Sequence, residues 1–255
     1  MNGKSLSTEE SGAAGPMAMS ASGPVGSTSD AIPLLPSWAS TGGGLDLESF
    51  ASGDYRESVA IEVPAFHGIE PSISLDYNSS LKLQYSAGGN GAMGRGWALK
   101  GIAVIERATR GGGAPRFDAN DVYALTGEEM VDCVAGMVSP SCASGGTHTT
   151  RIESYNRIKF DSSANRWLVW ARDGTRYEFW PVGQVVPASG DTDLLDHYRW
   201  LLKSVTDTHG NQASYSYVCD QLVNCGVSQI SYGPVTIAFA WESRPDPFYY
   251  ATGKN

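Results

Sequence analysis

The first residues that could carry chemistry form a glycine-rich run between 89 and 94. Its sequence, Gly-Asn-Gly-Ala-Met-Gly, matches the G-x-G-x-x-G fingerprint of dinucleotide-binding proteins. That fingerprint binds a pyrophosphate only where a helix starts at the glycines and presents its N-terminus to the ligand. Here the glycines continue to Gly96, and the pattern from Trp97 onward predicts a strand. We therefore expect no nucleotide or other cofactor at this run.

A second candidate is a calcium loop. Asp118, Asn120 and Glu129 stand at its first, third and twelfth positions. The sixth position requires glycine for a sharp turn, and in this chain it is Tyr123. We therefore predict an ordinary polar turn that leads into a strand, and no metal site.

Signatures of catalysis do not stand out in the sequence. The nucleophile elbow G-x-S-x-G does not occur. Nothing singles out a pair of carboxylates for glycoside hydrolysis, since separation in space decides such pairs. None of the histidines is at metal-ligand spacing from another: His67, His148, His197 and His209. We predict that the chain is not an enzyme and has no catalytic residue, with an unrecognised hydrolase left as an alternative.

Aromatic residues offer another kind of site. Four tryptophans could stack on sugar rings: Trp167, Trp170, Trp180 and Trp200. Aromatics on neighbouring short strands more often form a core, and we expect a core here. The alternative is a glycan- or receptor-binding module that uses exposed aromatics. Two or more coplanar, exposed tryptophans on one face would favour glycan binding.

The four cysteines fall into two local pairs, Cys133 with Cys142 and Cys219 with Cys225. Each pair brackets a short segment, and an even count is typical of proteins matured under oxidising conditions. We predict two local disulfides and an extracellular or secreted location, although no export signal is visible in the chain. Reduced thiols are the alternative. A zinc site is disfavoured because neither pair has the tight knuckle spacing of such sites.

Composition excludes two classes of partner. The formal net charge is −9 and the pI is near 4.9. Nucleic-acid binding requires clustered Lys and Arg, and no such block occurs. No apolar run approaches the roughly 20 residues of a membrane span. We expect neither a nucleic-acid partner nor a membrane-spanning segment.

The order of apolar and turn residues predicts an all-β fold, with many short antiparallel strands in a meander or partial shell. Residues 1–44 are dominated by Gly, Ser, Ala, Pro and Thr, so we expect a disordered arm before a domain that spans 45–255. Residues 135–150 are predicted to form a loop and 191–197 a short helical turn. Strands are expected at 59–63, 73–77, 81–85, 97–106 with a bend at Gly101, 122–126, 157–160, 166–171, 175–180, 197–205, 213–217, 228–232 and 235–241.

The stretch from Asp207 to Tyr217 has a clear hairpin pattern. Gly210 accepts positive φ freely, and Asn211 tolerates it better than most residues. In the outgoing strand Tyr215 and Tyr217 alternate with serines, which places both rings on one face. We expect Asp207, Gly210 and Asn211 to set the turn and the two tyrosines to pack. None of them is expected to catalyse a reaction.

Several motifs, taken in chain order, resemble those of a known family. They are Pro71 to Ser79, the glycine-rich run that ends at Trp97, Asp173 to Tyr177, the pattern D-x-x-G-N-x-x-x-Y-x-Y from Asp207, and Ile230 to Gly233. Together they resemble the N-terminal domain of the Salmonella virulence plasmid toxin B (SpvB) family, which is shared with the B component of insecticidal toxin complexes. The last hairpin is similar to those of Rhs/YD-repeat proteins.

This resemblance implies a non-catalytic structural module of a secreted Rhs/toxin-complex-like protein. Such a module helps to enclose or present a toxic polypeptide, so the expected partners are other parts of a larger assembly or a toxic C-terminal polypeptide. The ADP-ribosyltransferase that follows a similar domain in the Salmonella protein needs a Glu-x-Glu pair, which is missing here. Because the chain stops at Asn255, where the family continues with further strands, we expect a truncated member with an unpaired sheet edge.

Overall fold

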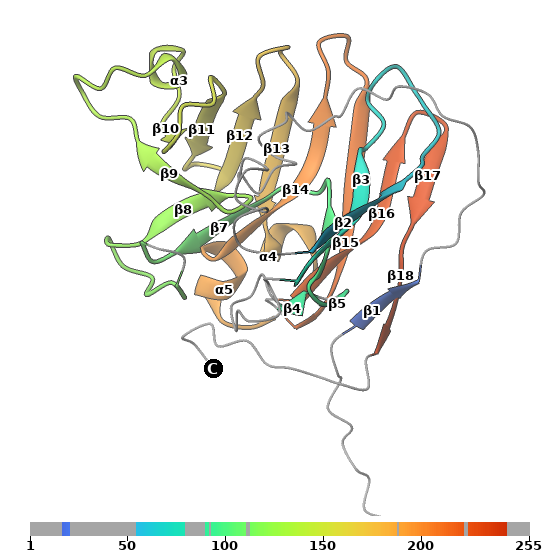
Figure 1. The fold of residues 1–255 in the computed structure, drawn as a ribbon. Coiled ribbons are helices and arrows are strands. Elements are labelled where there is room, and N and C mark those ends of the chain that lie inside the picture. Colours follow the sequence, from blue (N-terminus) through green and yellow to red (C-terminus); the bar gives the residue numbers. More distant parts are fainter. Residues whose placement is uncertain are drawn as a thin grey trace, which may run out of the picture.

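The computed structural model describes residues 17–20, 55–79, 90–91, 93–110, 113–187, 189–221 and 224–243. Antiparallel strands dominate this part of the chain, and its helices are short (Figure 1). The predicted all-β class is therefore confirmed. None of the helices within the described residues is long and apolar enough to cross a membrane.

The strands are β1 (Met17–Ser20), β2 (Arg56–Ile61), β3 (Ile73–Asn78), β4 (Asn90–Gly91), β5 (Gly94–Arg95), β6 (Trp97–Lys100), β7 (Val104–Ala108), β8 (Val122–Leu125), β9 (Glu128–Asp132), β10 (His148–Thr150), β11 (Arg157–Asp161), β12 (Arg166–Trp170), β13 (Arg176–Pro181), β14 (Arg199–Thr206), β15 (Gln212–Gln221), β16 (Asn224–Tyr232), β17 (Val235–Ala238) and β18 (Ala240–Ser243). The helices are α3 (Pro140–Ala143), α4 (Val182–Val185) and α5 (Thr192–Asp196).

Strand β14 closes eight antiparallel strands into a barrel. The order β13-β12-β11-β10-β9-β8-β7-β14 runs through hydrogen-bonded neighbours, and β13 also pairs with β14. Residues 199–201 of β14 pair with 104–106 of β7, while 200–206 pair with 176–181 of β13. Because the first part of β14 is bonded on both sides, the ring closes there without a free edge.

Aromatic and branched side chains fill this barrel. Cross-strand pairs share one face of the sheet, as Trp167 with Phe179 and Val169 with Tyr177 do. Trp167 and Trp200 meet edge to face, with ring centroids 6.1 Å apart. The buried side chains on the barrel strands include Ile105, Leu125, Met130, Ile158, Trp167, Val169, Tyr177, Phe179, Trp200, Leu202 and Val205.

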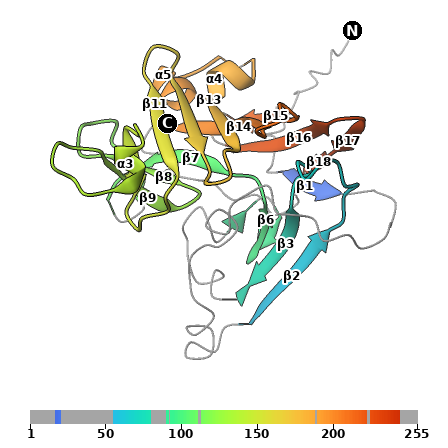
Figure 2. The same cartoon turned by 90° about the horizontal axis from the view of Figure 1, so that it is seen from above.

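Beyond the barrel the sheet continues as the β15–β17 wall. Residues 204–206 of β14 pair with 212–214 of β15, and β16 and β17 follow in order. The buried face of the wall joins the core, and the Tyr232 hydroxyl donates to the Pro64 carbonyl at 2.8 Å. The small sheet of β2, β3 and β6 stands apart from the barrel in Figure 2. The wall is therefore a stiff extension of the barrel through β14.

Two predictions about elements need correction. The predicted loop at 135–150 contains α3, which Ser139 caps by accepting from the N–H of Cys142, and also contains β10, which pairs with β9. Strand β9 was not predicted, because Glu-Glu-Met-Val-Asp lacks apolar alternation. The predicted strand at 81–85 lies outside the described residues. So does the predicted arm, except for 17–20, which pair with β18.

The predicted strand at 97–106 is interrupted near its predicted bend, between β6 and β7. Gly101 has a φ of +93°, and a Cβ added there would lie 1.8 Å from the Ser72 carbonyl oxygen. Glycine alone combines this backbone conformation with so close an approach. The bend directs the chain from the small sheet into the barrel.

We expect Gly101→Ala to lower the free energy of unfolding by at least about 2 kcal/mol, because a backbone clash adds to the strain of positive φ. Gly136→Ala is the matched control. Gly136 has a φ of +84° with open space around an added Cβ, so strain alone should cost about 1 kcal/mol. Urea unfolding followed by tryptophan fluorescence measures both. Equal losses would contradict the close approach at Gly101.

Candidate functional site

The Asp207–Asn211 turn joins β14 to β15. The Asp207 carboxylate accepts hydrogen bonds from the backbone N–H groups of His209 and Asn211, at 2.8 and 2.9 Å, and from the Asn211 side-chain amide at 2.7 Å. Gly210 has a φ of +85°. Partial burial acts to raise the pKa of Asp207, but the hydrogen bonds from Asn211 and His209 bring that pKa below its ordinary value. One carboxylate therefore organises the turn.

The two tyrosines of β15 pack on the core side of the wall. Tyr215 is only 1% exposed. The Tyr217 hydroxyl donates to the Leu202 carbonyl of β14 at 2.8 Å. Burial raises the pKa of both phenols, so both are neutral at ordinary pH. Their contacts hold β15 against the core and bring no reactive group to the surface.

Part of the opposite side of the wall is a polar face without charge, and Val218 of β15 is exposed as well. Segments 212–218 and 225–238 contain no Asp, Glu, Lys or Arg. Ser214 lies opposite Ser231, and Ser216 lies opposite Gln229, whose amide donates to the Ser231 hydroxyl at 2.8 Å. All members of this polar face are exposed except the half-buried Ser231: Gln212, Ser214, Ser216, Gln229, Ser231 and Thr236.

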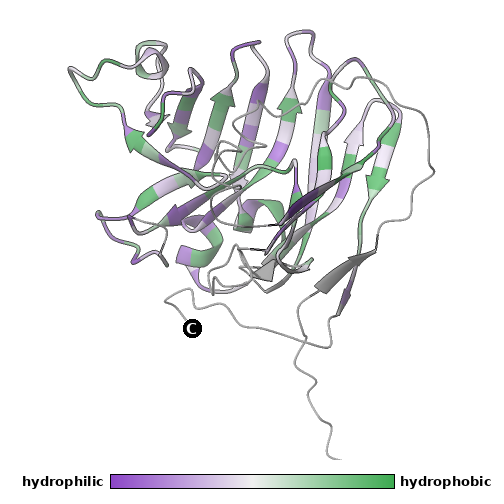
Figure 3. Ribbon diagram, viewed as in Figure 1, coloured by the Kyte–Doolittle hydropathy of each residue, from purple (hydrophilic) through white to green (hydrophobic). Residues whose placement is uncertain are grey.

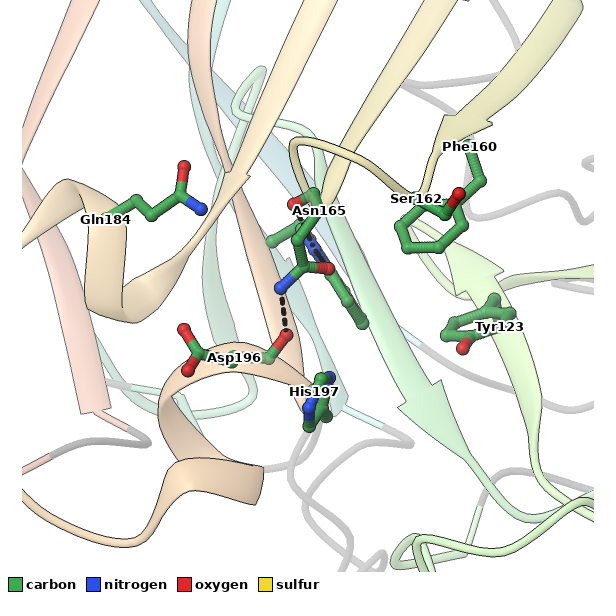
Figure 4. Close-up of a pocket in the computed structure, with 8 residues that line it drawn as sticks. Tyr123, Phe160, Ser162, Asn165, Gln184, Asp196 and His197 are labelled. Atoms are coloured by element: carbon green, nitrogen blue, oxygen red, sulfur yellow. Dashed lines mark hydrogen bonds between the residues drawn. The ribbon is translucent and has the colours of Figure 1, made fainter.

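A cleft of about 420 Å³ lies where the β11–β12 turn and the segment before β14 meet, at one mouth of the barrel. Figure 4 shows the rings of Tyr123 and Phe160 on one side and Gln184 and Asp196 on the other. Burial raises the pKa of the Tyr123 phenol, and Arg107 partly opposes this rise. The lining residues are Tyr123, Phe160, Ser162, Asn165, Gln184, Asp196, His197 and Trp200.

Structural hydrogen bonds occupy the centre of this cleft. The Asn165 amide donates to the Asp196 carbonyl at 2.7 Å, and its side-chain oxygen accepts from the Trp200 indole at 3.2 Å. The lining includes one carboxylate, Asp196, and one imidazole, His197. Glycoside hydrolysis uses two facing carboxylates, and the described lining does not supply the second. The cleft can accommodate a small polar molecule, but its geometry defines no reaction.

The tryptophans considered for sugar stacking are packed by other parts of the protein. Trp167 and Trp200 are buried in the barrel. The Arg157 guanidinium lies 3.7 Å from the ring centroid of Trp170, and a second guanidinium, from Arg166, covers Trp180 at 3.6 Å. These four rings therefore do not form the exposed, coplanar platform that would favour glycan binding.

His148 is a buried imidazole in the barrel. Its Nε2 lies 2.9 Å from the exposed Asp132 carboxylate, and its Nδ1 lies 2.9 Å from the Thr147 hydroxyl. Its ring also contacts Trp167 edge to face, at 4.7 Å between centroids. Burial lowers the pKa of His148, and Asp132 only partly opposes this effect. The imidazole is therefore held neutral.

The candidate ligand motifs have structural roles. In the calcium-like loop, Asp121 accepts from the Phe117 N–H at 2.6 Å and pairs with Arg107 at 2.8 Å. Strands β4 and β5 form a hairpin at the glycine-rich run, and β6 begins at Trp97, so a strand rather than a helix follows the glycines. Among the described residues, no group of three or more His, Cys, Asp or Glu side chains could hold a metal ion.

Both predicted disulfides are present. Cys133, directly after β9, is bonded to Cys142 of α3, with 5.5 Å between the Cα atoms. Cys219 is bonded to Cys225, with 4.0 Å between the Cα atoms, and links β15 to β16. All four cysteines are therefore used, which removes both the free-thiol and the zinc alternatives.

The fold and these contacts define an all-β domain in which motifs that resemble ligand sites maintain the structure. Residues 50–182 match the family described as Salmonella virulence plasmid 65kDa B protein (SpvB). The chain belongs to this family, as its motifs predicted. A search of the curated proteins finds no match.

Solved structures with a similar fold come from toxins. The N-terminal domain of the effector protein SpvB from Salmonella typhimurium strain LT2 is 19% identical, with a TM-score of 0.51 over 76% of this chain and 77% of that chain. A chain of the Photorhabdus luminescens Tc holotoxin pore is 18% identical, with a TM-score of 0.51 over 98% of this chain. A chain of a TcdB2-TccC3 complex is 20% identical, with a TM-score of 0.50 over 70%.

This protein spans only 11% and 9% of the lengths of the two Tc chains. At these identities the likeness shows a shared fold. The Rhs/YD-repeat character of the 207–217 hairpin stays a prediction.

We expect Asp207→Ala to lower the free energy of unfolding by about 1–3 kcal/mol, because two backbone N–H groups and one amide lose their acceptor. Asp207→Asn keeps an acceptor oxygen and should lower the free energy of unfolding by less.

Gly210→Val should lower the free energy of unfolding by about 1–2 kcal/mol through backbone strain alone, since an added Cβ meets nothing within 4 Å. Thermal and urea denaturation measure these changes. A Gly210→Val protein that melts with the parent would contradict the assigned turn.

His148 makes stability depend on pH. In the unfolded chain His148 has the ordinary histidine pKa of about 6.5, and in the folded protein its pKa is lower. The unfolded state therefore binds more protons than the folded state as the pH falls. The free energy of unfolding should be highest above about pH 7 and decline toward about pH 5. His148→Phe should flatten this decline, whatever its effect on stability at pH 7. If the parent is instead more stable at the lower pH, the ion pair with Asp132 outweighs burial.

Proposed function

We propose that the chain is a non-catalytic structural module of a secreted, toxin-complex-like protein. Its β15–β17 wall would line a space that encloses or presents a toxic partner polypeptide. The expected partners are the other parts of that assembly or the toxic polypeptide itself. The observation that carries this proposal is the uncharged polar face of the wall, held rigidly on a closed barrel.

The chemistry of the polar face suits enclosure. Its hydroxyl and amide groups interact with one another or with water, as Gln229 and Ser231 do. Strong protein contacts draw on large aromatic and Arg side chains, and the polar face has neither. A polypeptide beside the polar face would therefore make few strong contacts with it, whether its own side chains are positively or negatively charged. Such a surface can confine a chain without trapping it in one bound conformation.

The mechanics of the fold also support this role. Because β14 belongs to both the barrel and the wall, the wall is anchored along a strand that cannot shift register without breaking the ring. The Cys219–Cys225 disulfide fixes β15 to β16 farther out. The relatives with a similar fold are described as a Tc holotoxin pore, a TcdB2-TccC3 complex and an effector domain, which accords with a toxin-related module.

Glycan or receptor binding is a second candidate. It is favoured by the half-buried Tyr123 and Phe160 rings that face polar groups across the cleft. The structure supports this second candidate less well than enclosure, because Asn165 is already hydrogen-bonded within the protein and the described tryptophans give no exposed platform.

Site-specific photocrosslinking in the protein expressed from its complete reading frame, together with its partner polypeptide, tests the enclosure. A photoreactive benzoylphenylalanine at Ser216 on the polar face should crosslink to the enclosed polypeptide. The matched control is the same group at Lys159, which is exposed on barrel strand β11 and should give no such product. Equal crosslinking from both positions, or none from Ser216, would contradict the proposal. Unchanged melting temperatures would show that both variants fold.

A further inference from the structure

An unusual concentration of exposed apolar side chains lies at one end of the molecule. Of the eight large hydrophobic residues that are exposed in the described part, five belong to the Cys133–Cys142 loop and to segment 151–155. Val138 is 100% exposed and Ile152 is 76% exposed. We refer to these five side chains as the apolar tip: Val134, Met137, Val138, Ile152 and Tyr155.

Strong polar contacts fasten the two segments of the apolar tip to each other. The Glu153 carboxylate accepts from the hydroxyl of Ser139 at 2.6 Å and from the hydroxyl of Ser141, which is buried. It also accepts from the Tyr155 N–H at 2.7 Å. Ser139 directly follows Val138, and Glu153 directly follows Ile152, so these bonds join the two segments at positions next to the two most exposed side chains. The backbone of the tip is therefore partly fixed before any binding.

The position of the apolar tip is also distinctive. In Figure 1 the loop around α3 projects sideways beyond β9 and β10, and in Figure 2 the same loop lies at the outer end of the molecule. Figure 3 shows much of this projecting loop in the hydrophobic colours. A loop that projects in this way can enter another medium.

From these observations we infer that the apolar tip inserts into the interfacial region of a lipid bilayer. Four of the five side chains are aliphatic or thioether groups, and the tip has neither Trp nor Arg, two of the residues that dominate protein–protein binding. This composition suits lipid more than a protein partner. Membrane-surface binding instead scales with the apolar area that enters the boundary between headgroups and acyl chains. Tyr155, with the Arg172 guanidinium 4.5 Å from its ring centroid, has the chemistry that suits the headgroup level.

The charges around the tip indicate which kind of bilayer it suits. Arg151 is paired with Glu129 at 3.7 Å, the exposed Asp173 directly follows Arg172, and Glu153 adds a carboxylate within the tip. The whole chain carries −9. Anionic lipids therefore supply no net attraction, and apolar insertion must carry the binding. This predicts attachment to zwitterionic membranes that changes little with salt.

Cosedimentation with phosphatidylcholine vesicles tests the inference. The parent protein should sediment with the vesicles, with a bound fraction that changes less than about twofold when salt rises from low to high ionic strength. The Val138→Asp/Ile152→Asp double variant should bind the vesicles with an affinity at least about tenfold lower, because two charges would have to enter the interface. Val59→Asp is the matched control. Val59 is an exposed valine on the small sheet, and its replacement should leave binding unchanged.

Three outcomes would overturn the inference. The first is a parent protein that stays in the supernatant at millimolar lipid, and the second is a double variant that binds as well as the parent. The third is self-association, seen by sedimentation velocity without lipid and abolished in the double variant, which would assign the apolar tip to a contact between copies. Because both substituted side chains point to solvent, the variants should melt with the parent. Vesicle binding does not depend on the proposed enclosure, so either proposal can fail alone.

Discussion

The pairing of β14 on both sides is the constraint on which the rest of the structure depends. Its first residues bond to β7 and β13, and its last residues bond to β13 and β15. Helices α4 and α5 contact β14, and its side chains at 200–202 are all buried. The segment 200–202 is therefore covered on both faces, which explains its run of three apolar residues, Trp-Leu-Leu. Barrel closure, wall orientation and the position of the cleft all follow from this one strand.

Local sequence signals predicted much of the fold. Alternation of apolar residues located most strands, because a half-buried sheet face imposes a period of two. Turn chemistry identified the bend at Gly101 and a tight turn at 207–211, where positive φ is required. Two closely spaced cysteine pairs predicted the disulfides that the structure contains. The family followed from motifs in order, each of which was weak alone.

Features that depend on distant pairing could not be predicted in the same way. Strand β13 pairs with β14 as well as with β12, and this additional pairing leaves no signature in the sequence of either strand. Strand β9 was missed because its acidic residues are accommodated at the barrel surface, where tertiary pairing overrides propensity. The cleft draws residues from 123 to 200, and the apolar tip requires Glu153 to reach two serines. Sequence spacing carries no information about such contacts.

These features combine into a module in which a closed barrel holds a wall with an uncharged, polar, exposed face. In the proposed function, the polar face of the β15–β17 wall lines an enclosed space. An electron cryomicroscopy map of the protein expressed from its complete reading frame tests this most directly. The polar face should point into a chamber that contains density for a second polypeptide. A map in which Ser214 and Ser216 face bulk solvent outside any chamber would contradict it.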